Sequence, residues 1–299
     1  SDRDIFLREL LSNASDAIQK RKYLGLTDPD LLNSSDDSIV LRFDPKKKML
    51  EIQDSGIGLN EIELSETLGT LAKSGTASFL EQLEKAKDDK TAASNLIGKF
   101  GVGFYSSFMV ADTVEVLTRK AGTTEGFLWT SDGKTGYEIA PSNESLEIGT
   151  LVRLFLKKDA KDYADFEKVK AITKKYSDHI SVGIHIQDKD GKQEQVNSAE
   201  ALWTRASKDI TKDEYKGFYQ SQFGAYDDPY VTLHNRSEGT LEFTNLLFVP
   251  STAPFDLFDP ERKSKLNLYI NRVFITNDLD AILPKWLRFI QGVLDTSSL

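Results

Sequence analysis

Three polar residues near the start of the chain have the types and the spacing of a chemical site. Glu9, Asn13 and Asp16 lie four and three residues apart, which places them on one stripe of a helix. A carboxylate and an amide oxygen one turn apart can act as a general base and a metal ligand. Asn and Asp are poor residues for a helix interior, because their side chains compete for backbone hydrogen bonds. The alternative is an ordinary solvated stripe on a surface helix.

A second candidate site begins at Asp54. The run MLEIQ before it predicts a strand, so Leu50, Ile52 and Asp54 share one face. A carboxylate at the end of an apolar face is costly unless something pairs with it. Gly56 and Gly58 follow at once, and the lack of side chains there lets another molecule approach the backbone. The alternative is a turn capped by Asp54, because DSG is common in turns.

A third candidate is the segment IGKFGVGF, in which Gly98, Gly101 and Gly103 precede an apolar, helix-like run. A glycine-rich turn that opens a helix presents free N–H groups and a positive dipole end to an anion. This spacing is a weak signal by itself, since close helix packing explains it as well. Glycines also flank the amphipathic stretch between Gly75 and Gly98, which predicts a hinged lid.

The elements that position these residues follow from hydrophobic periodicity. For a first domain, residues 1–187, we expect helices at Asp4–Tyr23, Asn60–Leu68 and Asp165–Tyr176, and strands at Ile39–Phe43, Met49–Gln53, Thr113–Thr118, Gly126–Ser131, Tyr137–Ala140, Gly149–Leu156 and Ile180–Gln187. The polar segment 188–199 has almost no apolar residues and predicts a short linker.

A second domain is expected at residues 200–299. Its predicted elements are a helix at Trp203–Phe223, strands at Tyr230–Leu233, Thr240–Pro250 and Lys265–Thr276, and a final amphipathic helix at Leu283–Leu294 with a proline near its start. Both domains mix helices with strands, which predicts an α/β protein.

The composition narrows the function classes. The 299 residues include 38 Lys and Arg against 47 Asp and Glu, a net charge of −9, which argues against a general nucleic-acid surface and against adhesion to anionic lipid. There is no cysteine, and His179, His185 and His234 lack metal-ligand spacing. No disulfide, thiolate chemistry or structural zinc site is therefore expected. We also expect no membrane span and no signal peptide.

The order of these motifs is more specific than any one of them. The chain closely resembles the heat shock protein 90 chaperones, which belong to the gyrase, chaperone, histidine kinase and MutL ATPase superfamily. The matching segments are FLRELLSNASDA, DSGIGL, LGTLAKSGT, IGKFGVGFYSSF, KYSDHI, ALWTR, EGTLEF, LLFVPSTAPFDLF and NRVFI. The resemblance implies a two-layer α/β sandwich, the Bergerat ATP-binding fold with a mixed sheet covered by helices, followed by part of a second α/β domain, the middle domain.

The resemblance also implies roles for single residues. Asp54 matches the acceptor of the adenine amino group, Asn13 the magnesium-contacting asparagine, and Glu9 the general base that activates the attacking water. The other residues that match the ATP-binding set are Asp16, Ala17, Gly58, Leu59, Thr67, Lys73, Gly98, Gly101, Val102, Gly103, Phe104 and Thr150. The implied cofactors are ATP or ADP with Mg²⁺, and phosphoryl transfer needs mainly positioning and charge neutralisation.

Three positions depart from the commonest family pattern. Thr67 stands where Asn or His is frequent, Leu59 where Met is usual, and Lys99 where Gln is usual. The first two alter the shape of the expected pocket, and Lys99 adds a charge near the phosphates. In the family, a middle-domain arginine and a dimerisation domain follow the segment that ends this chain, so we expect slow hydrolysis by this chain alone.

The implied partners are client proteins, a second copy in the full-length homodimer, and co-chaperones, with no nucleic acid and no membrane insertion. The short linker favours a bacterial, cytoplasmic form, with a mitochondrial or other organellar form as the alternative. Two rival functions stay open. One is a topoisomerase-like or mismatch-repair ATPase, which predicts a basic second domain, and the other is a nucleotide-gated interaction module without turnover.

Overall fold

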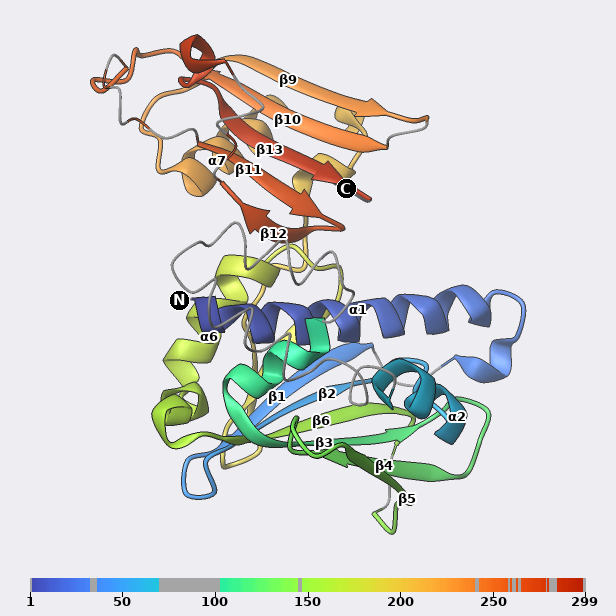
Figure 1. The fold of residues 1–299 in the computed structure, drawn as a ribbon. Coiled ribbons are helices and arrows are strands. Elements are labelled where there is room, and N and C mark those ends of the chain that lie inside the picture. Colours follow the sequence, from blue (N-terminus) through green and yellow to red (C-terminus); the bar gives the residue numbers. More distant parts are fainter. Residues whose placement is uncertain are drawn as a thin grey trace. The chain divides into compact units, whose positions relative to one another are not determined.

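The computed structural model describes residues 2–32, 37–69, 103–144, 147–239, 242–257, 265–277 and 284–297, together with residues 259, 262 and 279. The chain divides into two compact units. The first consists of Ser1–Asp178 and Val182–Ala199, and the second of His179–Ser181 and Glu200–Leu299. Each unit combines helices with a sheet (Figure 1), which confirms the predicted α/β class.

A mixed eight-stranded sheet forms one layer of the first unit, in the order β5-β4-β3-β6-β2-β1-β7-β8. Neighbouring strands are antiparallel except β1 and β7, which are parallel. The strands are β1 (Ser38–Asp44), β2 (Met49–Asp54), β3 (Ala111–Arg119), β4 (Gly126–Ser131), β5 (Tyr137–Pro141), β6 (Gly149–Leu156), β7 (Gly183–Gln187) and β8 (Gln193–Gln195). The strands predicted for this domain are all present, with some ends shifted.

Helices form the second layer of this unit, and α1 lies over the sheet beside β1 and β2 (Figure 1). The helical segments are α1 (Ile5–Gly25), α2 (Glu61–Leu64), α6 (Phe166–Ser177), a π-helical turn at Ser65–Gly69, and 3-10 helices at Asp2–Asp4, Pro29–Leu31, Gly103–Met109 and Lys158–Ala164. On α1, Phe6, Leu7, Leu11 and Ile18 are completely buried, as its apolar face predicted. The unit is thus the two-layer α/β sandwich that the resemblance implied.

Strand β2 explains the position of Asp54. Leu50, Ile52 and Asp54 are buried, whereas Glu51 and Gln53 between them are only partly buried. On the face that carries Glu51, Arg153 of β6 forms an ion pair with Glu51 at 2.8 Å. The predicted alternation is therefore confirmed, and it directs Asp54 toward the space between sheet and helices.

The second unit contains a five-stranded sheet in the order β12-β11-β13-β10-β9. Its elements are α7 (Lys212–Phe223), β9 (Pro229–Ser237), β10 (Phe243–Pro250), β11 (Lys265–Ile270), β12 (Val273–Thr276) and β13 (Gln291–Thr296). Tyr219 of α7 packs in one core cluster with Trp203, Phe248 and Val293. The helix expected at Trp203–Phe223 is shorter than predicted, because α7 begins with a capping box at Thr211 and short 3-10 turns precede it.

Two predictions in the second unit are wrong. Where the helix Leu283–Leu294 was expected, the described residues form a 3-10 helix at Lys285–Leu287 and then strand β13, which runs between β11 and β10. A Cβ at Gly292 would lie 2.3 Å from Leu246 O, so glycine permits this close pairing, and pairing on both edges outweighs the helical pattern. The strand expected at Lys265–Thr276 is a hairpin that turns at Asn271 and Arg272, both with positive φ.

The linker expected at 188–199 also differs, because these residues are structured within the first unit. Strand β8 pairs with β7, and the Asn197 side chain accepts from Ile184 N at 2.8 Å and donates to Val182 O at 3.0 Å. An edge strand needs only backbone pairing, so its exposed polar side chains gave no strand signal. None of the helices in the part of the chain that the structure describes could cross a membrane.

Asp227 ties three segments of the second unit together. Its carboxylate accepts hydrogen bonds from Tyr219 Oη at 2.9 Å, from Ser251 N at 2.8 Å and from Thr252 N at 3.2 Å. Partial burial acts to raise the pKa of Asp227, but the bonds from Tyr219, Thr252 and Ser251 outweigh it and lower the pKa below the ordinary 3.8. The ionised carboxylate therefore stabilises this unit.

We expect Asp227→Asn to lower the free energy of unfolding by about 1.5–3 kcal/mol near pH 7, because bonds to a charged acceptor are lost. The difference should be present above pH 3.8 and should shrink as the pH falls through the lower folded-state pKa. Urea unfolding followed by tryptophan fluorescence measures it. Asp228→Asn is the control, since Asp228 is exposed and pairs with Lys216 at 2.8 Å. Equal effects of the two substitutions would contradict the assignment.

Candidate functional site

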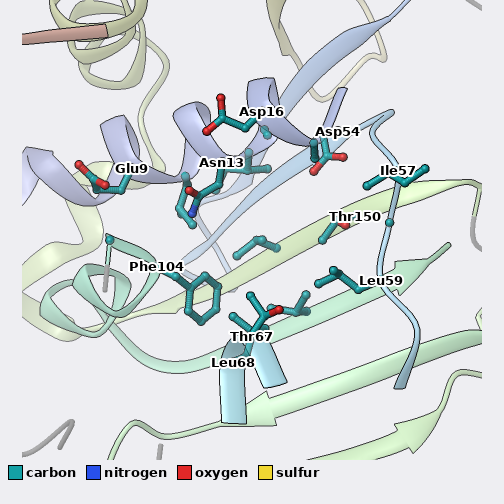
Figure 2. A pocket seen from close by; sticks show the side chains of 18 of the residues that line it. Glu9, Asn13, Asp16, Asp54, Ile57, Leu59, Thr67, Leu68, Phe104 and Thr150 are labelled. Carbon is teal, nitrogen blue, oxygen red and sulfur yellow. The ribbon is translucent and has the colours of Figure 1, made fainter. Parts of the chain in front are cut away.

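A cavity of about 490 Å³ lies between α1 and the sheet of the first unit. Ile52, Val116 and Val152, from β2, β3 and β6, give it an apolar floor. One side is α1, and the segment after β2 together with the start of the 3-10 helix at Gly103 forms the rest (Figure 2). A pocket of this size, mostly apolar with a few polar groups, is typical of a small-molecule site.

Every predicted site residue that the structure describes lines this cavity. These residues are Glu9, Asn13, Asp16, Ala17, Asp54, Gly58, Leu59, Thr67, Gly103, Phe104 and Thr150. The remaining predictions, Lys73, Gly98, Gly101 and Val102, lie outside the described residues, as do Lys99 and the expected lid. The floor residues Ile52, Val116 and Val152 were not among the predicted site residues, although the period-two pattern of β2 already pointed Ile52 to the same face as Asp54.

Asp54 lies at one end of the cavity and is only 7% exposed. Its Oδ1 accepts a hydrogen bond from Gly56 N at 2.8 Å. Burial raises the pKa of Asp54 to about 7, while the backbone N–H groups of Gly56 and Thr150 and the charge of Arg21 act in the opposite direction. A carboxylate in this position can accept a further hydrogen bond from a ligand N–H group.

The two glycines after Asp54 serve a different purpose from the one that the sequence indicated. A Cβ at Gly56 would lie 2.6 Å from Ala17 Cβ, and one at Gly58, where φ is +68°, would lie 2.1 Å from Arg119 O. The space that side chains would need is thus filled by α1 and by the end of β3. The glycines allow the loop to pack against the protein itself, and this packing shapes one side of the cavity.

Thr118 of β3 is a buried hydroxyl that the sequence analysis missed. Its Oγ1 accepts from Leu59 N at 2.9 Å, donates to Gly149 O at 3.1 Å and lies 3.0 Å from Thr150 Oγ1. Leu59 and Thr150 both line the cavity. Thr118 therefore holds Leu59 and Thr150 in place at the cavity wall. Its role follows from contacts between residues distant in the sequence, so the sequence alone gave no signal for it.

Glu9 lies at the other end of the site from Asp54, with Asn13 and Asp16 between them (Figure 2). Arg8, itself 4% exposed, donates from Nε and Nη2 to Glu9 Oε1 at 3.0 and 2.7 Å. A Cβ at Gly103 would lie 2.2 Å from Glu9 Oε2. Arg8 thus orients the carboxylate, and glycine at 103 leaves room for it.

Phe104 closes the wall beside Gly103. Its ring meets Trp129 edge to face, with centroids 5.6 Å apart, and meets Tyr105 in the same way at 5.7 Å. These aromatic contacts hold the start of the 3-10 helix against the sheet. The predicted turn before this helix lies outside the described residues, so the structure places only its last glycine, Gly103, at the cavity.

Comparison with known families identifies the class to which this site belongs. Residues 5–135 match the model of histidine kinase-, DNA gyrase B- and Hsp90-like ATPases, so the first unit contains an ATPase domain of this class. Residues 185–299 match the model of the Hsp90 protein. The second match argues against the topoisomerase-like and mismatch-repair alternatives.

Curated relatives give the same result over the whole chain. The chain is 49% identical to the chaperone protein HtpG of Orientia tsutsugamushi, 49% to that of Roseobacter denitrificans and 48% to that of Rickettsia prowazekii. These alignments cover 100% of this chain and 47–48% of each relative, so the chain spans about half the length of the curated relatives it matches. The chain belongs to the Hsp90 family.

The packing of the loop after β2 can be tested with Gly56→Ala. The added methyl group meets both Ala17 and the Asp54 carboxylate, so we expect a loss of about 1–3 kcal/mol in the free energy of unfolding. Urea unfolding provides the measurement. Gly217→Ala is the control, because a Cβ there meets nothing within 4 Å, and alanine within α7 should raise stability by about 0.5–1 kcal/mol. A neutral Gly56→Ala would show that the loop tolerates displacement.

Proposed function

We propose that the protein is an ATP-dependent molecular chaperone, and that the cavity of the first unit binds ATP with Mg²⁺. The observation that carries the proposal is the division of one cavity into two chemically different ends. Asp54 is enclosed at one end, and Glu9 and Asn13 stand one helical turn apart at the other. A nucleotide is divided in the same way, into a flat base and a charged phosphate chain, and the HtpG relatives support this assignment.

At the enclosed end, Asp54 is the proposed acceptor for the amino group of adenine. The apolar floor formed by Ile52 and Val152 offers the carboxylate no hydrogen bond, whereas an amino group can supply one. The flat base would occupy the slot beside the floor. The residues proposed to complete this end are Asp16, Ala17, Gly58, Leu59, Thr67 and Thr150.

At the other end, Asn13 is the proposed protein ligand of Mg²⁺. This ion is usually held by one or two protein oxygens together with phosphate oxygens and water, so one amide oxygen at this position is sufficient. Bound ATP and Mg²⁺ would supply the phosphoryl group and the neutralising charge. Glu9 is proposed to orient a water molecule and to accept its proton, and Arg8 holds its carboxylate in place. The further proposed contacts at this end are Lys73, Gly98, Gly101, Val102, Gly103 and Phe104.

For the complete protein we propose client proteins as partners, a homodimer as the working form, and co-chaperones as further partners. The bacterial relatives favour a bacterial, cytoplasmic form over an organellar one. The proposed domain division is an ATP-binding domain at 1–187 and the first part of a middle domain at 200–299, with residues 188–199, which we expected to be a linker, packed in the first unit.

One observation favours a second candidate, a nucleotide-gated interaction module without turnover. The Glu9 carboxylate is engaged by Arg8 at 2.7 Å, and a carboxylate that never leaves this ion pair would not activate water. The two candidates agree on nucleotide binding and differ only in turnover.

Asp54→Asn tests recognition of the base. We expect nucleotide binding to weaken by about 1.5–3 kcal/mol, roughly ten- to a hundredfold, because a charge-assisted hydrogen bond is lost. Calorimetry with ADP near pH 8, where wild-type Asp54 is mainly ionised, measures the affinity. Asp44→Asn is the control, since Asp44 also ends a strand but accepts hydrogen bonds from Lys46 N and Lys47 N of its own hairpin turn. Unchanged affinity in Asp54→Asn would disprove the adenine assignment.

Glu9→Ala separates the two candidate functions and is best made in the complete protein. Nucleotide affinity should stay near that of the wild type, and ATP turnover should fall on the order of 10²- to 10⁴-fold, because the general base is removed. A steady-state phosphate-release assay measures turnover. Gln19→Ala, an exposed position on the same helix, should leave turnover unchanged. Equal turnover in Glu9→Ala and wild type would favour the module without catalysis.

A further inference from the structure

Arg21 is a buried cation that the proposed function does not use. It lies in α1 and is 2% exposed. Its Nε donates to Leu31 O at 2.6 Å and its Nη1 to Ser55 O at 2.7 Å. Within the described part of the chain, its Nη2 is buried without a hydrogen-bond partner. Burial of a guanidinium is costly, so the position of this charge calls for a physical explanation.

The Ser55 carbonyl connects Arg21 to Asp54. Ser55 C=O and Gly56 N–H belong to one planar peptide group, and Gly56 N donates to Asp54 Oδ1 at 2.8 Å. Arg21 therefore binds one side of a rigid unit whose other side binds the carboxylate. A hydrogen bond to the carbonyl also polarises the peptide and strengthens the bond that its N–H group donates.

The same turn is attached to α1 at a second point. Ile57 N donates to Ala17 O at 3.1 Å, and Ala17 lies one helical turn before Arg21. Two successive turns of the helix thus hold two adjacent peptide groups of this turn: Arg21 binds the Ser55–Gly56 peptide, and Ala17 binds the Gly56–Ile57 peptide. Without Arg21, the Ile57 bond would remain, but the peptide could rotate and turn its N–H group away from Asp54.

Arg21 is also the cation that acts on Asp54. Its charge opposes the rise in pKa that burial imposes on the carboxylate. Acidic groups also lie near this corner. Asp16 of α1 lines the same cavity, and Asp37, which faces Arg21, forms an ion pair with Lys22 at 2.9 Å.

We propose that Arg21 is a positioning residue for base recognition, which acts through the Ser55–Gly56 peptide to keep the Asp54 carboxylate ionised and oriented toward the cavity. The inference rests on the proposed function, in which Asp54 accepts a hydrogen bond from the base. It adds a residue that does not line the cavity to those that determine nucleotide affinity.

The test compares Arg21→Met with Lys22→Met, which removes the same charge from the next residue of α1, where the side chain is 55% exposed. The Asp54 carboxyl group is titrated by NMR in nucleotide-free protein, and ADP affinity is measured by calorimetry. For Arg21→Met we expect an Asp54 midpoint about one pH unit higher. ADP should then bind about fivefold more weakly than to the wild type near pH 7. Near pH 9 the affinities should be similar, because Asp54 is then ionised in both proteins. Lys22→Met should match the wild type in both measurements.

An unchanged Asp54 midpoint in Arg21→Met, or an equal shift in Lys22→Met, overturns the proposal. Where Arg21→Met does not fold, the wild type supplies a second measurement. The Arg21 Nε–H resonance must then shift with the same midpoint as the Asp54 carboxyl, and a resonance that does not respond overturns the proposal as well. A wild type that binds no ADP contradicts the proposed function instead, and the titration of the free protein still decides the role of Arg21.

Discussion

A carboxylate enclosed between a sheet and a helix is the constraint on which the first unit depends. The alternation of β2 directs Asp54 inward, where an ionised group is stable only with hydrogen bonds and compensating charge. The Gly56 amide, the Thr150 amide and Arg21 provide these. Each contribution fixes a different piece of the fold: the turn after β2, the neighbouring strand β6 and the end of α1. The site and the scaffold are thus stabilised by the same contacts.

Aspartates also connect distant segments in the second unit, and there they bind groups of the protein itself. Asp295 of β13 accepts from Trp203 Nε1 at 2.7 Å, and Asp227 binds both Tyr219 of α7 and the segment that follows β10. The donors of these carboxylates all come from the protein. Asp54 differs because it also lines an open cavity, and this difference marks it as a candidate for ligand recognition.

Local periodicity explains which parts of this structure the sequence could predict. The stripe of α1 and the alternation of β2 depend only on neighbours along the chain, so Glu9, Asn13 and Asp54 could be placed at once. Thr118 and Arg21 could not, because their partners lie 59 and 34 residues away. The segment that forms β13 was mistaken for a helix, since its amphipathic pattern is local and its pairing with β10 and β11 is not.

The two ends of the cavity separate two carboxylates whose proposed tasks, base recognition by Asp54 and activation of water by Glu9, need opposite surroundings. A hydrogen bond that recognises a base is strong only where water is excluded, and Asp54 is 7% exposed. A general base must reach a water molecule, and the Glu9 side chain keeps 21% of its surface exposed beside Arg8. The helix between Glu9 and Ala17 rises by about 12 Å, which is far enough for one group to stay dry while the other stays wet. On α1, Glu9 and Ala17, the second of which binds the turn after Asp54, thus hold the two proposed tasks apart.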